Sequence, residues 1–550
     1  MSTIESADGL DAVYANPKSM FIPIENIPED AQKESIATIS SWRLKGLVFI
    51  SGAVLMGLEM AGSRVLAIHF GSSIYVWGSI IGIFLAALAG GYYAGGLAAD
   101  RKPSFLLLNL IALAAGCWLV LLPFYDNFIA RGIRSTHLGA RTEPLLTTIM
   151  LFGGPSVLMG MVSPFSVRLS ASGLERIGNV AGGLYALSTV GSIAGTMITA
   201  FWLVPLIGTH AILRTLGLCL AAMALIGLSK SRALLAVTAP LVPLVFAVSA
   251  LSPSPFVRLE AAQQLLLEAD SAYHHVQVVD DVHSNTRQLR FNNFTETIVN
   301  RQPPHDSDTY TNSFQLARIF KRDLQRIMVI GGGGAIGPRQ FVDQDPQTIV
   351  DLVEIDPLVV DISRRYFFLP DDSRLKVHVE DGRNFARATT DRYDLVILDA
   401  FTVGGQVPFH LTTQEFMHEV RSLLKPDGVF LVNINSAVEG PNSRILRAEY
   451  KTALTVFDAV LIFPRPFDTE RGKPKLALSR GRNVILIGLA GRNDWTLDSV
   501  AGTARSLMKE EKARTPTFLD DALQLYTGRP RTDDVPLLTD DYAPVDTMVF

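Results

Sequence analysis

Seven long apolar segments occupy the first half of the chain and constrain its fold more than any other feature. They lie at residues 45–68, 74–99, 104–125, 145–167, 180–205, 209–228 and 233–251. Each is close to the ~20 residues that an α-helix needs to cross a bilayer core. Hydrophobic residues make up 48% of the chain and charged residues 19%. This hydrophobic fraction is high, and the charged fraction low, for a soluble protein of this length. Buried helices of a soluble domain would not give seven such segments in succession, so the pattern predicts a multi-span α-helical membrane bundle.

Changes in composition along the chain predict its domains. Residues 1–42 are polar and lack the basic-then-apolar pattern of a signal peptide, so we predict a disordered tail there. The bundle is expected over 43–252, a small β-rich lead-in subdomain over 253–325 and an α/β domain over 326–550. In the lead-in, apolar and polar residues alternate in the manner of strands over 274–281, 287–293 and 295–300.

Basic residues near the ends of the apolar segments predict the orientation of the bundle. If the segments alternate, one side carries Arg43, Lys45, Arg101, Lys102, Arg168, Arg176, Lys230 and Arg232, and the other carries Arg131, Arg134 and Arg141. The positive-inside rule then places the N-terminus in the cytoplasm, and seven crossings would place the soluble domain outside, away from any cytosolic ligand. We therefore expect one segment not to cross and the soluble domain to face the cytoplasm. The weakest segment is 233–251, which is interrupted by Pro240 and Pro243.

Several polar residues in the apolar region have structural interpretations. Glu59 and Arg64 lie in the first segment. We interpret them as a pair that stabilises the bundle, or Arg64 as a side chain that extends to the interface, in preference to a transport site. Cys117 and Cys219 lie in apolar segments and indicate neither a disulfide nor a metal site. The net charge of −4 and the lack of a basic stripe argue against nucleic acid as a partner.

Residues 327–356 have the pattern of a nucleoside-binding βαβ unit. An apolar run over 327–330 enters four glycines, and a second run over 349–353 ends on an acid. Glycines let the backbone pass close to a ligand, and an acid at the tip of the second strand can bind both hydroxyls of a ribose. The predicted cofactor-binding residues of this unit are Gly331, Gly332, Gly333, Glu354 and Asp356.

Two further acids follow predicted strands. From residue 326 onward strands and helices alternate, which predicts a parallel Rossmann-like sheet covered on both faces. Asp381 and Gly382 follow one strand and Asp399 ends another, and ligands of such sheets lie beyond the carboxyl ends of the strands. Each acid has an alternative interpretation as a turn former or helix cap. We assign Asp381 and Gly382 to the cofactor site and Asp399 to catalysis. His410 is a second catalytic candidate, although a lone histidine is more often a packing or surface residue.

Over about residues 265–480 the chain resembles the spermidine synthase family, the polyamine aminopropyltransferases. The resemblance is carried by SAYHHVQVVDD, RQLRFNN, VIGGGGAIGPRQ, VEIDP, VEDGRNF and YDLVILDAF. It implies a fold like that of S-adenosylmethionine methyltransferases. It also implies that Glu354 binds the ribose of decarboxylated S-adenosylmethionine or methylthioadenosine, that Asp381 contacts adenine and that Asp399 is the catalytic carboxylate. The whole chain is similar to bacterial membrane proteins that join a multi-span region to such a domain, which implies the inner membrane. No metal is predicted.

Three positions depart from the family. Gly334 stands where the family has an Asp that helps to hold the aminopropyl ammonium group, Thr402 replaces a second acid in the catalytic loop, and His274 replaces a Gln. Because a diamine in a dry site needs paired carboxylates, the nucleoside half of the pocket looks intact and the polyamine half altered. Asp540 and Asp541 could restore acidic charge if the C-terminal tail folds over the cleft, but we prefer a solvated tail.

Three functions fit the sequence, and we rank them in order. The first is a membrane-anchored transferase that moves an aminopropyl group from decarboxylated S-adenosylmethionine to an amine or polyamine. The second is an S-adenosylmethionine-dependent methyltransferase. The third is a non-enzymatic nucleoside- or polyamine-responsive domain that regulates a transporter-like bundle. In each case the expected partners include the lipid bilayer, and a homodimer through the soluble domain is a further expectation.

Overall fold

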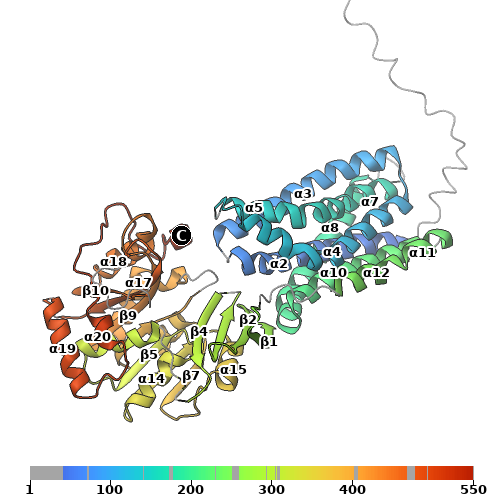
Figure 1. Ribbon diagram of the computed structural model, residues 1–550. Helices are drawn as coiled ribbons and strands as arrows, with labels where there is room; N and C mark the ends of the chain where they lie inside the picture. Colours follow the sequence, from blue (N-terminus) through green and yellow to red (C-terminus); the bar gives the residue numbers. More distant parts are fainter. Residues whose placement is uncertain are drawn as a thin grey trace, which may run out of the picture.

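The computed structural model describes residues 41–548, apart from 71–72, 140, 172–176, 230, 251–258, 293, 304, 306–309, 402–406, 468–476 and 492–493. The tail predicted over residues 1–42 therefore lies almost entirely outside the described residues. A helix bundle and an α/β part lie side by side, with the strands β1 and β2 nearest to the bundle (Figure 1).

The bundle contains seven helical segments that are long and apolar enough to cross a membrane, counted over the part of the chain that the structure describes. The first three are the helices α2 (Ser41–Phe70), α3 (Ile74–Arg101) and α4 (Phe105–Arg134). The fourth joins α5 (Thr142–Thr148), η2 (Ile149–Gly153), α6 (Gly154–Gly160) and α7 (Val162–Ser170), and the fifth joins α8 (Ile177–Ile198), η4 (Thr199–Leu203) and α9 (Val204–Leu206). The sixth is α10 (Thr209–Leu228), and the seventh joins α11 (Arg232–Thr238) and α12 (Leu241–Ala250). They coincide with the apolar segments of the sequence.

Small residues allow the bundle helices to approach one another closely. A Cβ atom on Gly191 or Gly195 of α8 would lie 2.2 Å from the carbonyl oxygen of Phe49 or 2.0 Å from that of Ala53, both on α2. No side chain fits at such distances, so the two backbones pack in direct contact, as is common where helices associate in an apolar environment.

The seventh helical segment runs back to the end of the bundle that faces the α/β part. Arg214, in the second turn of α10, donates hydrogen bonds to the Oγ atom (3.0 Å) and the carbonyl oxygen (2.8 Å) of Ser249 near the end of α12. Segment 233–251, the one expected not to cross, is thus among the segments long and apolar enough to cross a membrane. An odd number of full-length segments puts residue 41 and the α/β part at opposite ends of the bundle.

A four-stranded antiparallel sheet follows the bundle. Its strands are β1 (Gln263–Asp270), β2 (His275–Asp281), β3 (Thr286–Phe291) and β4 (Phe294–Asn300), paired in chain order. The last three coincide with the segments whose alternation predicts strands. The sequence analysis did not predict β1.

The larger sheet has seven strands in the order β10-β11-β9-β8-β5-β6-β7. Its strands are β5 (Arg326–Ile330), β6 (Ile349–Glu354), β7 (Leu375–Val379), β8 (Tyr393–Leu398), β9 (Leu424–Ser436), β10 (Ala459–Pro464) and β11 (Arg482–Leu489). The strands from β5 to β9 are parallel. β11 pairs antiparallel with β9, and β10 pairs antiparallel with β11 and so runs in the direction of the parallel strands. This arrangement confirms the Rossmann-like, methyltransferase-like sheet. The chain order reverses between β5 and β8, which is where ligands bind in such sheets.

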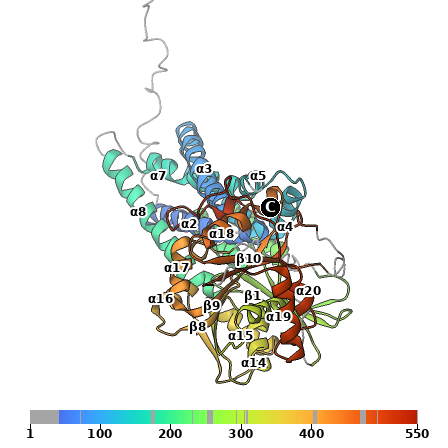
Figure 2. The same cartoon turned by 90° about the vertical axis from the view of Figure 1, so that its left-hand side faces the viewer.

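Helices cover both faces of the larger sheet, as Figure 2 shows for α16 and α17 on one side and α19 and α20 on the other. The helices are α13 (Ala317–Phe320), α14 (Ile336–Gln344), α15 (Pro357–Tyr366), α16 (Gly382–Ala388), α17 (Gln414–Leu423), α18 (Arg444–Ala453), α19 (Leu497–Lys509) and α20 (Phe518–Ala522). Along β5, Met328 and Ile330 pack into one apolar layer and Ile327 and Val329 into the other. This alternation fixes the strand register, so the loops after the strands meet at one edge.

Candidate active site

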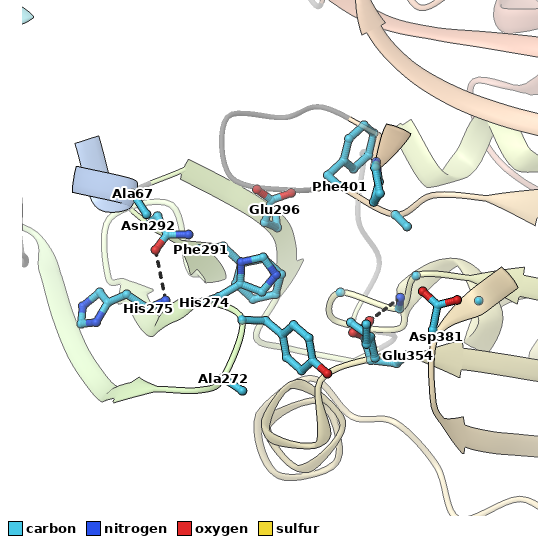
Figure 3. A pocket seen from close by; sticks show the side chains of 18 of the residues that line it. Ala67, Ala272, His274, His275, Phe291, Asn292, Glu296, Glu354, Asp381 and Phe401 are labelled. Carbon is cyan, nitrogen blue, oxygen red and sulfur yellow. Dashed lines mark hydrogen bonds between the residues drawn. The ribbon is translucent and has the colours of Figure 1, made fainter. Parts of the chain in front are cut away.

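A cavity of about 410 Å³ lies where the carboxyl ends of β5, β6 and β8, the four-stranded sheet and the helix bundle meet. Figure 3 shows Glu296, Glu354, Asp381 and Phe401 around it, with Ala67 contributed by the bundle. The cavity wall includes eight of the nine predicted site residues, which are Gly331, Gly332, Gly333, Glu354, Asp381, Gly382, Asp399 and His410. Four separate loops therefore bring the predicted residues together.

The glycine loop and Glu354 form one unit. Gly331 has φ +90°, and a Cβ atom there would lie 2.3 Å from the carbonyl oxygen of Asp399, so only glycine fits at this turn. The backbone N–H of Gly332 donates to Oε2 of Glu354 (2.8 Å), and the N–H of Asp356 donates to Oε1 (3.0 Å). These bonds fix the direction of the carboxylate, whose oxygens can accept further hydrogen bonds from a ligand's hydroxyl groups. Burial raises the pKa of Glu354.

Asp356 is the predicted site residue that does not line the cavity. Its side chain accepts a hydrogen bond from the N–H of Leu358 (3.0 Å) as the N-cap of α15 and also contacts the Ser271 hydroxyl. It is completely buried. Asp356 therefore supports Glu354 through its backbone N–H and caps α15 with its side chain. Its position outside the cavity wall does not favour the direct contact with a cofactor that the sequence predicts.

Asp381 and His410 lie together on the side of the cavity next to β7. Asp381 caps α16 by accepting hydrogen bonds from the N–H groups of Arg383 and Asn384, both at 3.0 Å. The Nε2 atom of His410 lies 3.1 Å from the other carboxylate oxygen of Asp381. The partner of His410 is thus the acid expected to contact adenine. This contact favours a positioning role for His410 over the catalytic role predicted from sequence.

Asp399 is held by two donors at the tip of β8. The Tyr310 hydroxyl donates to Oδ2 (3.1 Å), and the side-chain amide of Asn433 donates to Oδ1 (2.9 Å). The oxygen of the Asn433 amide accepts in turn from Asn483 (3.2 Å), which sets the orientation of that amide. Burial raises the pKa of Asp399 to about 7, against the lowering effect of its two donors. A carboxyl group with this pKa can accept a proton near neutral pH.

Glu296 is a cavity residue that the sequence analysis missed. It lies on β4, where the register shifts so that Leu289 faces Thr297 while the next residue of β3, Arg290, faces Thr295. Glu296 is therefore the extra residue of a β-bulge, a feature that redirects side chains next to active sites. Burial and the nearby Asp399 raise its pKa to about 8. A hairpin pattern such as RFNNFTET contains no signal that identifies the bulged residue before the fold is known.

The same bulge explains why the glycine loop has no acid at position 334. The Thr297 hydroxyl accepts a hydrogen bond from the N–H of Gly334 (2.9 Å). A Cβ atom on Gly334 would lie 2.6 Å from Cγ2 of Thr297 and 3.1 Å from Cδ1 of Phe367. The space for a side chain at 334 is therefore filled, and the neighbouring Glu296 presents a carboxyl group to the cavity instead.

The structure places the other residues that differ from the family, and the C-terminal acids, in different surroundings. Thr402 lies outside the described residues. His274 stacks on Phe291 with 4.5 Å between ring centroids and lines the cavity, and burial lowers its pKa to about 4, so it is a neutral part of an aromatic wall (Figure 3). Asp540 accepts two hydrogen bonds from Arg383 at 2.7 and 2.8 Å, and neither it nor Asp541 lines this cavity. Among the described residues no group of His, Cys, Asp and Glu side chains has the arrangement of a metal site.

The bundle closes the remaining side of the cavity. Arg64 of α2 donates hydrogen bonds to the carbonyl oxygens of Ser271 and Ala272 (3.1 Å for the latter). Asp270 accepts a hydrogen bond from the backbone N–H of Thr209 at the start of α10 (2.8 Å). The Arg64 side chain thus extends from α2 to the α/β part. This agrees with the interpretation of Arg64 as a side chain that extends out of the bundle.

Comparisons with known proteins give matches to part of this chain. The Spermine/spermidine synthase domain family matches residues 314–452. A polyamine aminopropyltransferase of Vibrio vulnificus is 32% identical over 171 residues, which cover 30% of this chain and 55% of that protein. The eEF1A lysine and N-terminal methyltransferase of Homo sapiens is 30% identical over 119 residues, which cover 20% of this chain and 17% of that protein. A solved structure of a probable spermidine synthase from Corynebacterium glutamicum is 24% identical, with a TM-score of 0.38, and covers 50% of this chain and 98% of that chain.

The C-terminal part of the chain therefore carries a spermidine synthase domain. The chain spans about half the length of the curated aminopropyltransferases that it matches.

Proposed function

We propose that the spermidine synthase domain is the catalytic part of a membrane-anchored transferase. It moves an aminopropyl group from decarboxylated S-adenosylmethionine to an amine. The observation that carries this proposal is the pair of buried carboxyl groups, Asp399 and Glu296, which lie in the same cavity as the nucleoside-type acid Glu354. A cation beside two buried acids favours their ionised, negative forms, and both the sulfonium donor and an amine acceptor are cationic.

The donor nucleoside is held by the residues at the ends of β5, β6 and β7. The carboxylate of Glu354, held by backbone N–H groups, accepts hydrogen bonds from the ribose hydroxyls, and Asp381, oriented by His410, faces the adenine ring. Gly331, Gly332 and Gly333 line the cavity without side chains, so the sulfur and its substituents can approach the backbone closely.

The transfer itself is a displacement at carbon. The amine nitrogen attacks the aminopropyl carbon next to the sulfonium, a C–N bond forms, and the C–S bond breaks. The sulfur keeps the electron pair and methylthioadenosine leaves as a neutral thioether. The amine loses one proton, and Asp399 accepts it, because its ionised carboxylate is fixed by Tyr310 and Asn433 with lone pairs left free.

Methyl transfer from S-adenosylmethionine is the second candidate. It is favoured by the stretch that is 30% identical to a methyltransferase. The tail of S-adenosylmethionine carries a carboxylate, however, and in this cavity it would lie beside the buried acids Glu296 and Asp399, each of which repels a carboxylate when it is ionised. The acid pair therefore supports the decarboxylated donor first.

The proposal is tested with the purified full-length protein in lipid nanodiscs. Methylthioadenosine, S-adenosylmethionine and its decarboxylated form are compared as ligands, and product is followed by mass spectrometry with a panel of amines. We expect release of methylthioadenosine with decarboxylated S-adenosylmethionine. Methylated product would establish the second candidate, and ligand binding without turnover of either donor would support the non-enzymatic role.

Replacing Glu354 by Gln should weaken the binding of methylthioadenosine at least about tenfold. A carboxylate that accepts two hydroxyl groups makes charge-assisted hydrogen bonds, which an amide replaces only in part. The matched control is Asp356→Asn, at the neighbouring acid that caps α15. Asn caps helices about as well as Asp. The affinity of the Asp356→Asn variant for methylthioadenosine, measured by isothermal titration calorimetry, should therefore change less than about threefold. Equal losses in both variants would show that Glu354 has no specific contact with the ribose.

We also propose that the helices cross the inner membrane of a bacterial cell and that the α/β part faces the cytoplasm. The positive-inside rule, applied to seven crossings, points the other way, but the proposed reaction requires a cytosolic nucleoside. A green fluorescent protein fused after Phe550 should therefore fluoresce, and alkaline phosphatase fused at the same position should be inactive. An active phosphatase fusion would place the domain outside and exclude the cytosolic donor.

A further inference from the structure

The part of the cavity that faces the bundle is apolar and belongs to the ends of two helices. Ala67 and Ile68 lie in the last turn of α2, and Val76 and Trp77 lie in the first turn of α3. Because α2 is 30 residues long, its last turn lies near the surface of a bilayer that the helix spans. The cavity wall therefore includes residues at the level of the membrane interface.

Charged groups on the same wall are already engaged by protein partners. Arg64 donates to the carbonyl oxygens of Ser271 and Ala272. Asp270 lies 2.6 Å from a ring nitrogen of His275, whose pKa is raised to about 9 by hydrogen bonds to Asp270 and Glu268 against the lowering effect of burial. Asp270 is thus paired with a cation of the protein. This wall is therefore poorly suited to a second ammonium group of a soluble diamine.

Trp77 connects the cavity to the outer surface of the bundle. It lines the cavity and is also 38% exposed. Ile74, Ile81 and Leu85 are 62%, 46% and 61% exposed, and with Trp77 they follow the spacing of a single helix face. An apolar stripe on α3, made of these four residues, thus continues from the cavity along the surface that faces lipid.

From this geometry we propose that the acceptor is an amphiphilic amine held in the membrane. Its ammonium head group lies between Glu296 and Asp399, and its hydrocarbon chain passes Trp77 and continues along the α3 stripe. The charge of the acid pair complements the head group, and the apolar helix ends complement the chain. This inference rests on the proposed function and names the class of acceptor that the same site takes.

The test compares acceptors that differ in chain length. The full-length protein in nanodiscs is assayed with decarboxylated S-adenosylmethionine and with 1,4-diaminobutane, butylamine or octylamine, and methylthioadenosine release gives kcat/KM. Since every methylene group moved out of water strengthens binding, we expect kcat/KM for octylamine to exceed that for butylamine at least about tenfold. 1,4-Diaminobutane should be no better than butylamine.

Two variants separate contact with the stripe from simple enrichment of octylamine in the bilayer. Trp77→Gln should reduce the octylamine-to-butylamine ratio at least about threefold. The matched control, Ile193→Gln, changes an exposed apolar position on α8 that is outside the cavity wall, and it should keep the ratio. If Trp77→Gln does not fold, as judged by methylthioadenosine binding, Ile81→Asn on the same stripe replaces it with the same expectation.

The failure of this inference is distinguishable from failure of the proposed function. Efficient use of 1,4-diaminobutane, with no dependence on chain length and no effect of Trp77→Gln, would overturn the amphiphilic acceptor and leave the aminopropyl transfer intact. A ratio that falls equally in Trp77→Gln and Ile193→Gln would also overturn it, since the effect would then come from the bilayer. Absence of methylthioadenosine release with every amine would overturn the proposed function itself.

Discussion

Replacement of Asp399 by Asn is expected to lower kcat/KM for aminopropyl transfer by about 10²-fold or more. The side chain keeps its size and can still contact Tyr310 and Asn433, which hold the carboxylate in the native protein. It can no longer accept the proton that the amine loses, and it no longer offsets the positive charge of the sulfonium. Methylthioadenosine affinity should stay within about twofold, because that nucleoside has neither the sulfonium charge nor an amine.

The pH profile gives this prediction a second readout. Asp399 must be ionised to act as a base, and its pKa is about 7. The rate of the native protein should therefore rise as the pH increases through about 7, where the protonated fraction falls, and be lost below that value. In Asp399→Asn the remaining rate should lack this limb. Full activity in the variant, or an unchanged profile, would remove Asp399 from the mechanism.

Replacement of Glu296 by Gln is expected to lower kcat/KM for amines by about 10- to 100-fold, mainly through a higher KM. The β-bulge aims this carboxyl group into the cavity, where a charge-assisted hydrogen bond to an ammonium group contributes about 1.5–3 kcal/mol. Methylthioadenosine affinity should change little, because Glu354 and Asp381, the proposed contacts of the nucleoside, are unchanged. Glu510→Gln, on the exposed end of α19, is a matched control that should behave as the native protein.

The acid pair also predicts a shift that a structural role would not produce. The negative charge of Asp399 contributes to the raised pKa of Glu296, which is about 8. Removing that charge in Asp399→Asn should therefore lower the pKa of Glu296, and the pH dependence of KM for the amine should move to lower pH. An unchanged pH dependence of KM in Asp399→Asn, together with an unchanged KM in Glu296→Gln, would show that Glu296 does not act in the amine site.

Local features of the sequence were sufficient for the helices, the parallel sheet and the nucleoside-type residues. Continuous apolar runs must be buried or face lipid, so their length alone predicts the bundle. Gly331, Glu354, Asp381 and Asp399 each follow a recognisable strand, and parallel strands bring their carboxyl ends to one edge. These residues therefore meet whatever the details of packing.

Other features depend on contacts between distant parts of the chain. Whether Asp356 faces a ligand or caps α15 depends on the turn after β6, and the partner of His410 depends on how its loop packs against α16. Asp540 binds Arg383, which is 157 residues away in the sequence. Such pairings have no local signature, because side chains of the same type serve as caps, ion-pair partners and ligands.

The sequence by itself determined that this protein joins an apolar helix bundle to a nucleoside-type α/β sheet, because hydrophobic periodicity and strand-end residues are local properties. Only the tertiary structure decided which carboxyl group joins Asp399 in the cavity and what closes that cavity. Glu296 enters the site through a one-residue shift in strand pairing, and Ala67 and Trp77 enter it because the bundle packs against the sheet edge. Both depend on how the strands and helices are placed relative to one another. That placement is set by the free energy of packing between distant parts of the chain, so no short segment of sequence encodes it.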